Sequence, residues 1–184
     1  ADGYDTYVHE LPKLGLGDIA ETAKSLVAFV DRILAATGAR RVDLIAHSQG
    51  GLIARYYVKK LGGRTKVDSL ISLGAPHYGT ELNVSGLCRS CGQMLVGSRF
   101  LNELNAGDDT IGSVDYTNIY TRTDLIVFPF KNSQLRNGAA NVLVQSQCFF
   151  RFVSHAGLIF DGAVYSGVKD ALRHRPITLD CWAI

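Results

Sequence analysis

The sequence predicts an α/β fold in which helices flank a largely parallel sheet. Two observations carry this prediction: short apolar runs typical of strands, and longer segments between them with apolar residues at helical spacing. Strands that alternate with helices in this way form parallel sheets. The 184 residues, 47% of them hydrophobic, suffice for one domain with a sizeable core, which we expect to cover residues 1–184.

Charge and hydropathy argue against two kinds of partner. The 19 basic and 17 acidic residues are spread along the chain without runs of one sign, so we expect no nucleic-acid partner. No apolar segment approaches the ~20 residues that a helix needs to span a bilayer, so we expect no transmembrane segment.

Each expected element has its own local signal. Asp18 followed by Glu21 forms a capping-box pattern at the start of a helix expected over residues 18–37. A second helix, expected over 52–60, ends before a pair of glycines. The remaining expected elements are strands at 6–12, 42–46, 67–73, 117–121 and 141–145, a final helix at 164–173, and an irregular stretch at 77–114 with a short helix at 98–105.

The strand at 42–46 runs into Ser48, which lies between small residues and precedes a helix. At a strained strand-to-helix turn this serine would have a positive φ, so the side chains two positions before and after it must be small. Ala46 and Gly50 meet that requirement. The order of strand, serine and helix predicts a nucleophile for acyl transfer at Ser48, with an ordinary polar turn as the alternative.

A serine hydroxyl becomes a good nucleophile only when a base takes its proton and a third group orients that base. We expect His155 to be the base because it follows the last clear strand and precedes the last helix. We expect Asp124 to be the acid because it follows the strand at 117–121 and precedes an apolar stretch that can shield it from water.

Order or position sets aside the other candidates, which are His9, His47, His77, His174, Asp108, Asp109, Asp115 and Asp161. His47 is expected to point to the wrong side of the serine turn. Asp108 and Asp109 are expected to be solvated in a polar loop.

The four cysteines allow several interpretations. Cys88 and Cys91 could form half a zinc site, a redox motif or a small disulfide loop, but zinc would need two further ligands at close spacing. We expect structural disulfides Cys88–Cys91 and Cys148–Cys181, with free core thiols as the alternative. An even number of cysteines in a hydrolase favours a secreted protein.

Four motifs resemble those of the small secreted bacterial lipases of the α/β-hydrolase superfamily. They are Ala46-His47-Ser48-Gln49-Gly50-Gly51, Leu73-Gly74-Ala75-Pro76-His77-Tyr78-Gly79-Thr80, Thr123-Asp124-Leu125-Ile126-Val127 and Ser154-His155-Ala156-Gly157-Leu158. The resemblance covers nearly the whole chain, although Ala46 replaces the first glycine of the G-x-S-x-G nucleophile elbow. It implies an α/β-hydrolase fold and a triacylglycerol lipase that cleaves carboxylic esters of fatty acids through Ser48, Asp124 and His155 and an acyl-enzyme, without a cofactor.

The resemblance has further implications for this chain. Similar lipases carry a cysteine pair in the loop after the G-A-P-H motif, which fits Cys88 and Cys91. Some relatives bind calcium or zinc, but the sequence has no matching cluster of ligands, so no metal is expected. One oxyanion donor is expected to be the backbone N–H of Gln49, at the start of the helix after the serine. Candidates for an acyl groove, or alternatively for the core, are Leu87, Met94, Leu95, Val96, Ile126, Phe128, Leu158, Ile159 and Phe160.

Other functions use the same residues. A carboxylesterase acting on short soluble esters would have the same triad, and a thioesterase or acyltransferase remains open. A protein of a different class would have the hydrolase fold and bind acyl ligands without turnover, or would need a partner chain for activity.

The second oxyanion donor of this fold comes from a loop after the third strand, upstream of the serine. If residues 6–11 form the fourth strand, only five residues precede them, and the third strand is absent. We therefore expect the chain to be the C-terminal part of a longer lipase that lacks the N-terminal oxyanion-strand segment. The alternative makes residues 7–11 the oxyanion strand, paired with residues 42–46, with the N–H of Glu10 or Leu11 as donor.

Overall fold

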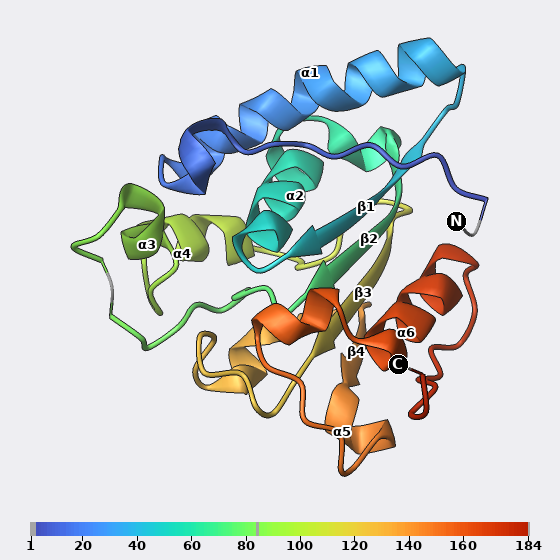
Figure 1. Ribbon diagram of the computed structural model, residues 1–184. Helices are drawn as coiled ribbons and strands as arrows, with labels where there is room; N and C mark the ends of the chain where they lie inside the picture. The colour runs from blue at the N-terminus through green and yellow to red at the C-terminus, as the bar shows by residue number, and fades with distance from the viewer. Residues whose placement is uncertain (1–2, 84, 184) are drawn as a thin grey trace.

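The computed structural model describes residues 3–83 and 85–183. Its sheet contains β1 (Val42–His47), β2 (Val67–Leu73), β3 (Asp115–Tyr120) and β4 (Ala140–Leu143), in the order β1-β2-β3-β4 (Figure 1). Every neighbouring pair is parallel. The predicted α/β class with a parallel sheet is confirmed, and all four strands point their carboxyl ends to the same edge.

Helices flank the two faces of the sheet (Figure 1). The long helices are α1 (Ile19–Thr37), α2 (Gln49–Lys60) and α6 (Gly162–Leu172). α1 and α2 pack together on one face, and α6 packs against β2 and β3 on the other. The shorter elements are η1 (Pro12–Gly15), η2 (Gly63–Thr65), α3 (Arg89–Gln93), α4 (Arg99–Asn105), η3 (Phe130–Ser133), α5 (Val144–Gln147) and η4 (Ala156–Ile159).

The core consists of two apolar clusters, one on each face of the sheet. β2 contributes to both, because successive side chains of a strand point to opposite faces. Leu70 belongs to the cluster beneath α1 and α2, and Ile71 belongs to the cluster beneath α6. Both side chains are fully buried, which makes β2 a central strand and fixes the serine turn beside it.

The start of α1 follows the predicted capping pattern in part. Asp18 is the N-cap, and its carboxylate accepts hydrogen bonds from the N–H groups of Ala20 and Glu21. The Glu21 side chain does not return the bond to the cap, because it pairs with Lys24 instead. The helix ends at Gly38, which has a φ of +71°.

The strand expected at residues 6–12 is not present. Residues 4–11 form neither helix nor strand, and η1 begins at Pro12. Val8 is 80% exposed, and no strand among the described residues pairs with this segment. Both interpretations of residues 6–11, as a fourth strand or as a strand paired with β1, are therefore wrong. Within the described residues β1 pairs only with β2.

Both expected disulfides are present. Cys88 is bonded to Cys91, and Cys148 is bonded to Cys181. The stretch 77–114 contains α3 in addition to the expected helix near 98–105. No helix among the described residues has the length and apolar character needed to cross a membrane.

Candidate active site

Ser48 occupies the turn between β1 and α2. Its φ of 53° and ψ of −126° lie in a region that non-glycine residues rarely adopt. Its N–H donates to the carbonyl of Leu73 at the end of β2, at 2.9 Å. A Cβ on Gly50 would lie 3.6 Å from the Cβ of Ala46, so residues larger than alanine would crowd this turn. The strained backbone holds the serine at the carboxyl edge of the sheet.

Three side chains from separate loops form a hydrogen-bonded line at this edge. His155 Nε2 lies 2.9 Å from Ser48 Oγ, and His155 Nδ1 lies 2.7 Å from Asp124 Oδ2. The other carboxylate oxygen of Asp124 accepts the N–H groups of Ile126 and Val127. Asp124 is buried and the His155 side chain is 11% exposed. The structure thus brings together the three residues that the sequence singled out.

The loop that carries His155 is anchored from two sides. The carbonyl of Val153 accepts hydrogen bonds from the hydroxyls of Thr121 and Thr123, which follow β3. The carbonyl of His155 itself accepts a hydrogen bond from Nε2 of His47, at 2.9 Å. His47 thus forms its hydrogen bond with His155, the residue expected to be the base, and the two imidazole rings lie side by side.

Gln49 is the first residue of α2. The N–H groups in the first turn of a helix have no acceptor within the helix, and they favour negative charge near the N-terminus. The side chain of Gln49 donates to the carbonyl of Gly15 in η1, at 2.8 Å. The hydroxyl of Ser90 donates to the same carbonyl. The carbonyl of Gly15 in η1 thus connects α3, through Ser90, with Gln49 at the start of α2.

Comparison with known proteins agrees with this arrangement. Residues 16–161 match the family described as lipase (class 2). The chain belongs to this family. It is 29% identical to lipase B of Pseudozyma antarctica over 175 residues, which cover 88% of this chain and 51% of that protein. It is also 47% identical over 58 residues to a triacylglycerol lipase of Pseudarthrobacter phenanthrenivorans, covering 32% of this chain and 18% of that one.

Among solved structures, Aspergillus fumigatus lipase B has the same fold. The TM-score is 0.83 at 23% identity, with 93% of this chain and 46% of that chain covered. The present chain spans about half the length of these two lipase B proteins, and a smaller share of the triacylglycerol lipase.

Two glycines of this class 2 lipase permit close approaches at the site. A Cβ on Gly51 would lie 2.4 Å from the Cβ of Ala75, so this glycine lets α2 approach the end of β2. Gly74 has a φ of +57°, and a Cβ there would lie 2.7 Å from Leu158 Cδ1. The same Cβ would be 3.4 Å from both Asp124 Oδ2 and His155 Nδ1. Sequence reasoning did not single out either glycine, although both lie inside the lipase-like motifs.

Gly74→Ala is expected to lower kcat for a short ester by about 10²-fold, because a displacement of roughly 1 Å in a catalytic group costs that much. The positive φ adds backbone strain, so the thermal unfolding midpoint should also fall. Gly86→Ala is the control, since no atom lies within 4 Å of a Cβ placed there. An unchanged kcat in Gly74→Ala would show that the contact between Asp124 and His155 does not depend on this close approach.

Asp109 is buried, contrary to the expectation that it is solvated. It is 1% exposed and lies 3.2 Å from a guanidinium nitrogen of Arg55, which is fully buried. Tyr78 donates its hydroxyl proton to the second carboxylate oxygen of Asp109. Sequence reasoning missed this pair because a polar loop gives no local sign that it folds over a buried arginine.

The remaining histidines have structural partners. His77 is fully buried, with Nε2 at 2.9 Å from the hydroxyl of Ser72, and burial together with Arg55 holds its pKa well below the usual range. His9 lies beside the hydroxyl of Ser25. His174 pairs with Asp115 at the amino end of β3, and this pair raises its pKa.

The candidates for an acyl groove separate into buried, partly buried and exposed side chains, and Leu95 is among the partly buried ones. Leu158 is buried in the core beneath α6, which agrees with the alternative that these residues belong to the core. Met94 is partly buried against the core under α1 and α2. The large side chains that remain exposed are Leu87, Val96, Ile126, Phe128, Ile159 and Phe160.

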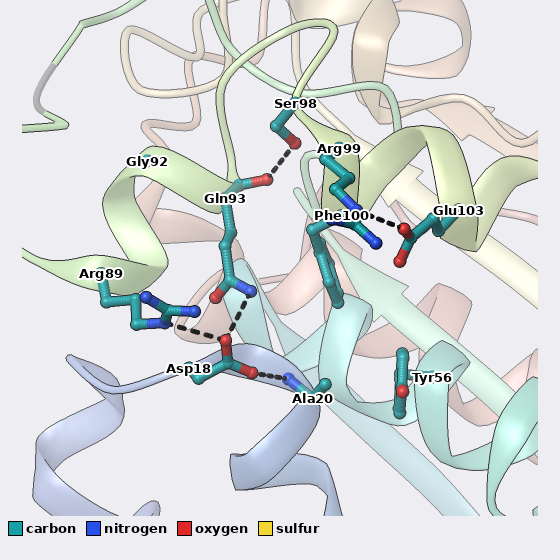
Figure 2. Close-up of a pocket in the computed structure, with 10 residues that line it drawn as sticks. All are labelled: Asp18, Ala20, Tyr56, Arg89, Gly92, Gln93, Ser98, Arg99, Phe100 and Glu103. Atoms are coloured by element: carbon teal, nitrogen blue, oxygen red, sulfur yellow. Dashed lines mark hydrogen bonds and ion pairs between the residues drawn. The ribbon is translucent and has the colours of Figure 1, made fainter.

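A cavity of about 440 Å³ lies away from the triad, between the start of α1, α3 and α4 (Figure 2). Asp18 there accepts hydrogen bonds from Arg89 and Gln93, and Ser98 donates to the carbonyl of Gln93. These bonds hold the loop closed by Cys88–Cys91 against the start of α1. No group of three or more metal-ligating side chains occurs among residues 3–83 and 85–183.

Proposed function

We propose that this chain is a serine hydrolase that cleaves carboxylic esters of fatty acids. The observation that carries the proposal is the line from Asp124 through His155 to Ser48, with both hydrogen bonds formed and the serine held at a strained turn. Membership of the class 2 lipases supports the choice of an ester as substrate.

In the proposed reaction, Ser48 Oγ attacks the carbonyl carbon of the ester while His155 Nε2 accepts its proton. Asp124 accepts the Nδ1–H hydrogen bond, which fixes the tautomer of His155 and stabilises the imidazolium. The N–H of Gln49 donates to the oxyanion. His155 then protonates the departing alcohol, leaving an acyl group on Ser48. A water molecule, activated by His155, hydrolyses this acyl-enzyme and releases the fatty acid.

The second oxyanion donor is proposed to come from a strand that pairs with the outer edge of β1. Within the described residues this edge has no partner strand, and Ile45 is 53% exposed. Unpaired backbone groups along a strand next to a reactive serine are unfavourable. A further segment of the protein or a partner chain is the proposed source.

The proposed substrate is a triacylglycerol, as the names of two relatives indicate for those proteins. Exposed apolar side chains that follow Asp124 and His155 in the sequence, among them Ile126, Phe128 and Phe160, favour a lipid-like acyl group. The two disulfides support a secreted protein, and the continuous sheet supports a single domain.

An active-site phosphonate and two substrates test this proposal. The phosphonate is expected to add once, at Ser48, and the protein is expected to hydrolyse emulsified long-chain triglyceride as well as short p-nitrophenyl esters. Labelling at another serine would overturn the assignment of the nucleophile. Turnover of short esters without triglyceride hydrolysis would overturn the lipase assignment and favour a carboxylesterase.

A further inference from the structure

A second histidine lies against the proposed catalytic histidine. His47 is the last residue of β1, directly before Ser48 in sequence. Its Nε2 is 2.9 Å from the backbone carbonyl oxygen of His155, and the centroids of the two imidazole rings are 4.7 Å apart. The proposed reaction gives His47 no task, yet it is half-buried at the centre of the site.

The side chain of His47 gives the carbonyl of His155 a hydrogen-bond partner from another segment of the chain. η4 begins just after His155. The N–H of Leu158 also donates to the carbonyl of Ser154, and the N–H groups of Phe160 and Asp161 donate to the carbonyl of Gly157. His155 is the N-cap residue of η4, so its carbonyl lies at the start of this short helix, where the His47 side chain reaches it. The loop is thus held on the Asp124 side by threonine hydroxyls at Val153, and on the Ser48 side by His47.

The chemistry of His47 suits this task. A carbonyl oxygen can only accept, so Nε2 of His47 must carry the proton. Burial is the largest effect and lowers the pKa of His47. The hydrogen bond to the His155 carbonyl raises the pKa, the nearby His155 ring lowers it, and Asp124 raises it, and the net effect is a lowered pKa. The ring is therefore neutral at neutral pH and adds no positive charge beside a histidine that must itself become cationic during turnover.

We propose that His47 is a positioning residue for His155, which holds the backbone carbonyl of His155 and thereby keeps its imidazole within reach of both Ser48 and Asp124. This inference rests on the proposed function of the triad. The carboxyl end of β1 would then have two functions: it positions Ser48, and through His47 it binds the loop that contains His155.

Two substitutions separate the hydrogen bond from the bulk of the ring. His47→Phe keeps a planar ring but has no donor, and His47→Gln keeps an N–H donor at the end of a flexible chain. His47→Phe is expected to lower kcat for a short p-nitrophenyl ester by about 10–100-fold through misplacement of the base. KM should change by no more than about twofold, because the contact does not involve substrate. His47→Gln is expected to recover most of the lost kcat.

A second readout reports the base directly. In proton NMR, the downfield resonance of the Nδ1–H that His155 shares with Asp124 is expected to persist in His47→Gln and to broaden or vanish in His47→Phe. Thermal unfolding of each variant checks that the protein is folded. His174→Gln is the matched control, because His174 is also hydrogen-bonded but lies at the opposite edge of the sheet. It should change neither kcat nor the resonance.

Two results would overturn the inference: a kcat in folded His47→Phe equal to that of the parent, or an equal loss in His47→Phe and His47→Gln. If the parent protein hydrolyses no ester, the proposed function fails, and the resonance alone decides the role of His47. Its persistence only where a donor remains supports positioning, and identical spectra in both variants reject it.

Discussion

Ser48→Ala is expected to lower kcat by on the order of 10⁶, and His155→Ala by a similar factor, because the two act as one unit in nucleophilic attack. Combining the two substitutions should add almost nothing to either one. Asp124→Ala should cost less, about 10⁴, since Ser48 and His155 remain paired without it. The measurement is kcat for a short soluble p-nitrophenyl ester, which avoids any requirement for a lipid surface.

The control is Ser85→Ala, an exposed serine hydrogen-bonded to Asn83 in a surface loop. It should retain full activity. Near-normal turnover in Ser48→Ala, with the protein folded by thermal unfolding, would mean that ester hydrolysis takes place elsewhere in the molecule.

Asp109→Ala is expected to lower the free energy of unfolding by about 3–5 kcal/mol, because it leaves the buried guanidinium of Arg55 without its carboxylate. Tyr78 and the N–H of Arg136 lose an acceptor in the same substitution. Urea denaturation measures the effect. Since Asp109 does not contact the triad, the folded fraction should retain its kcat.

An exposed ion pair provides the comparison. Arg41 and Asp68 are 3.0 Å apart, and both side chains are 41% exposed. Asp68→Ala should therefore cost less than about 1 kcal/mol. Equal losses for Asp68→Ala and Asp109→Ala would mean that burial of Arg55 does not determine the strength of its pairing.

The sequence predicted the parallel sheet, and it singled out the three residues that the structure brings into contact, because each leaves a local signal. Ser48 lies between small residues at a strand-to-helix boundary, and Asp124 and His155 follow strands. The cap at Asp18 was predictable for the same reason, since the cap and the N–H groups it binds are within three positions of one another.

What the sequence could not predict depends on contacts between distant segments. Burial of Asp109 requires Arg55, 54 positions away, and the contact of His47 with the His155 carbonyl spans 108 positions. The amino-acid composition of residues 6–11 is compatible with a strand, but a strand forms only where another strand can pair with it. Local patterns in a single sequence do not indicate which distant residues will form these contacts.

The strand order described above also constrains how the protein reaches its native state. Ser48 and His155 are 107 positions apart in the chain, and their contact forms only across a sheet whose every pairing is parallel and non-local. Such high contact order slows folding, because the entropy cost of closing a long loop comes before the strand pairing that stabilises the closed loop. The contact between Ser48 and His155, and any ester hydrolysis that depends on it, is thus expected to return after the helical signal when the denatured protein is diluted into buffer.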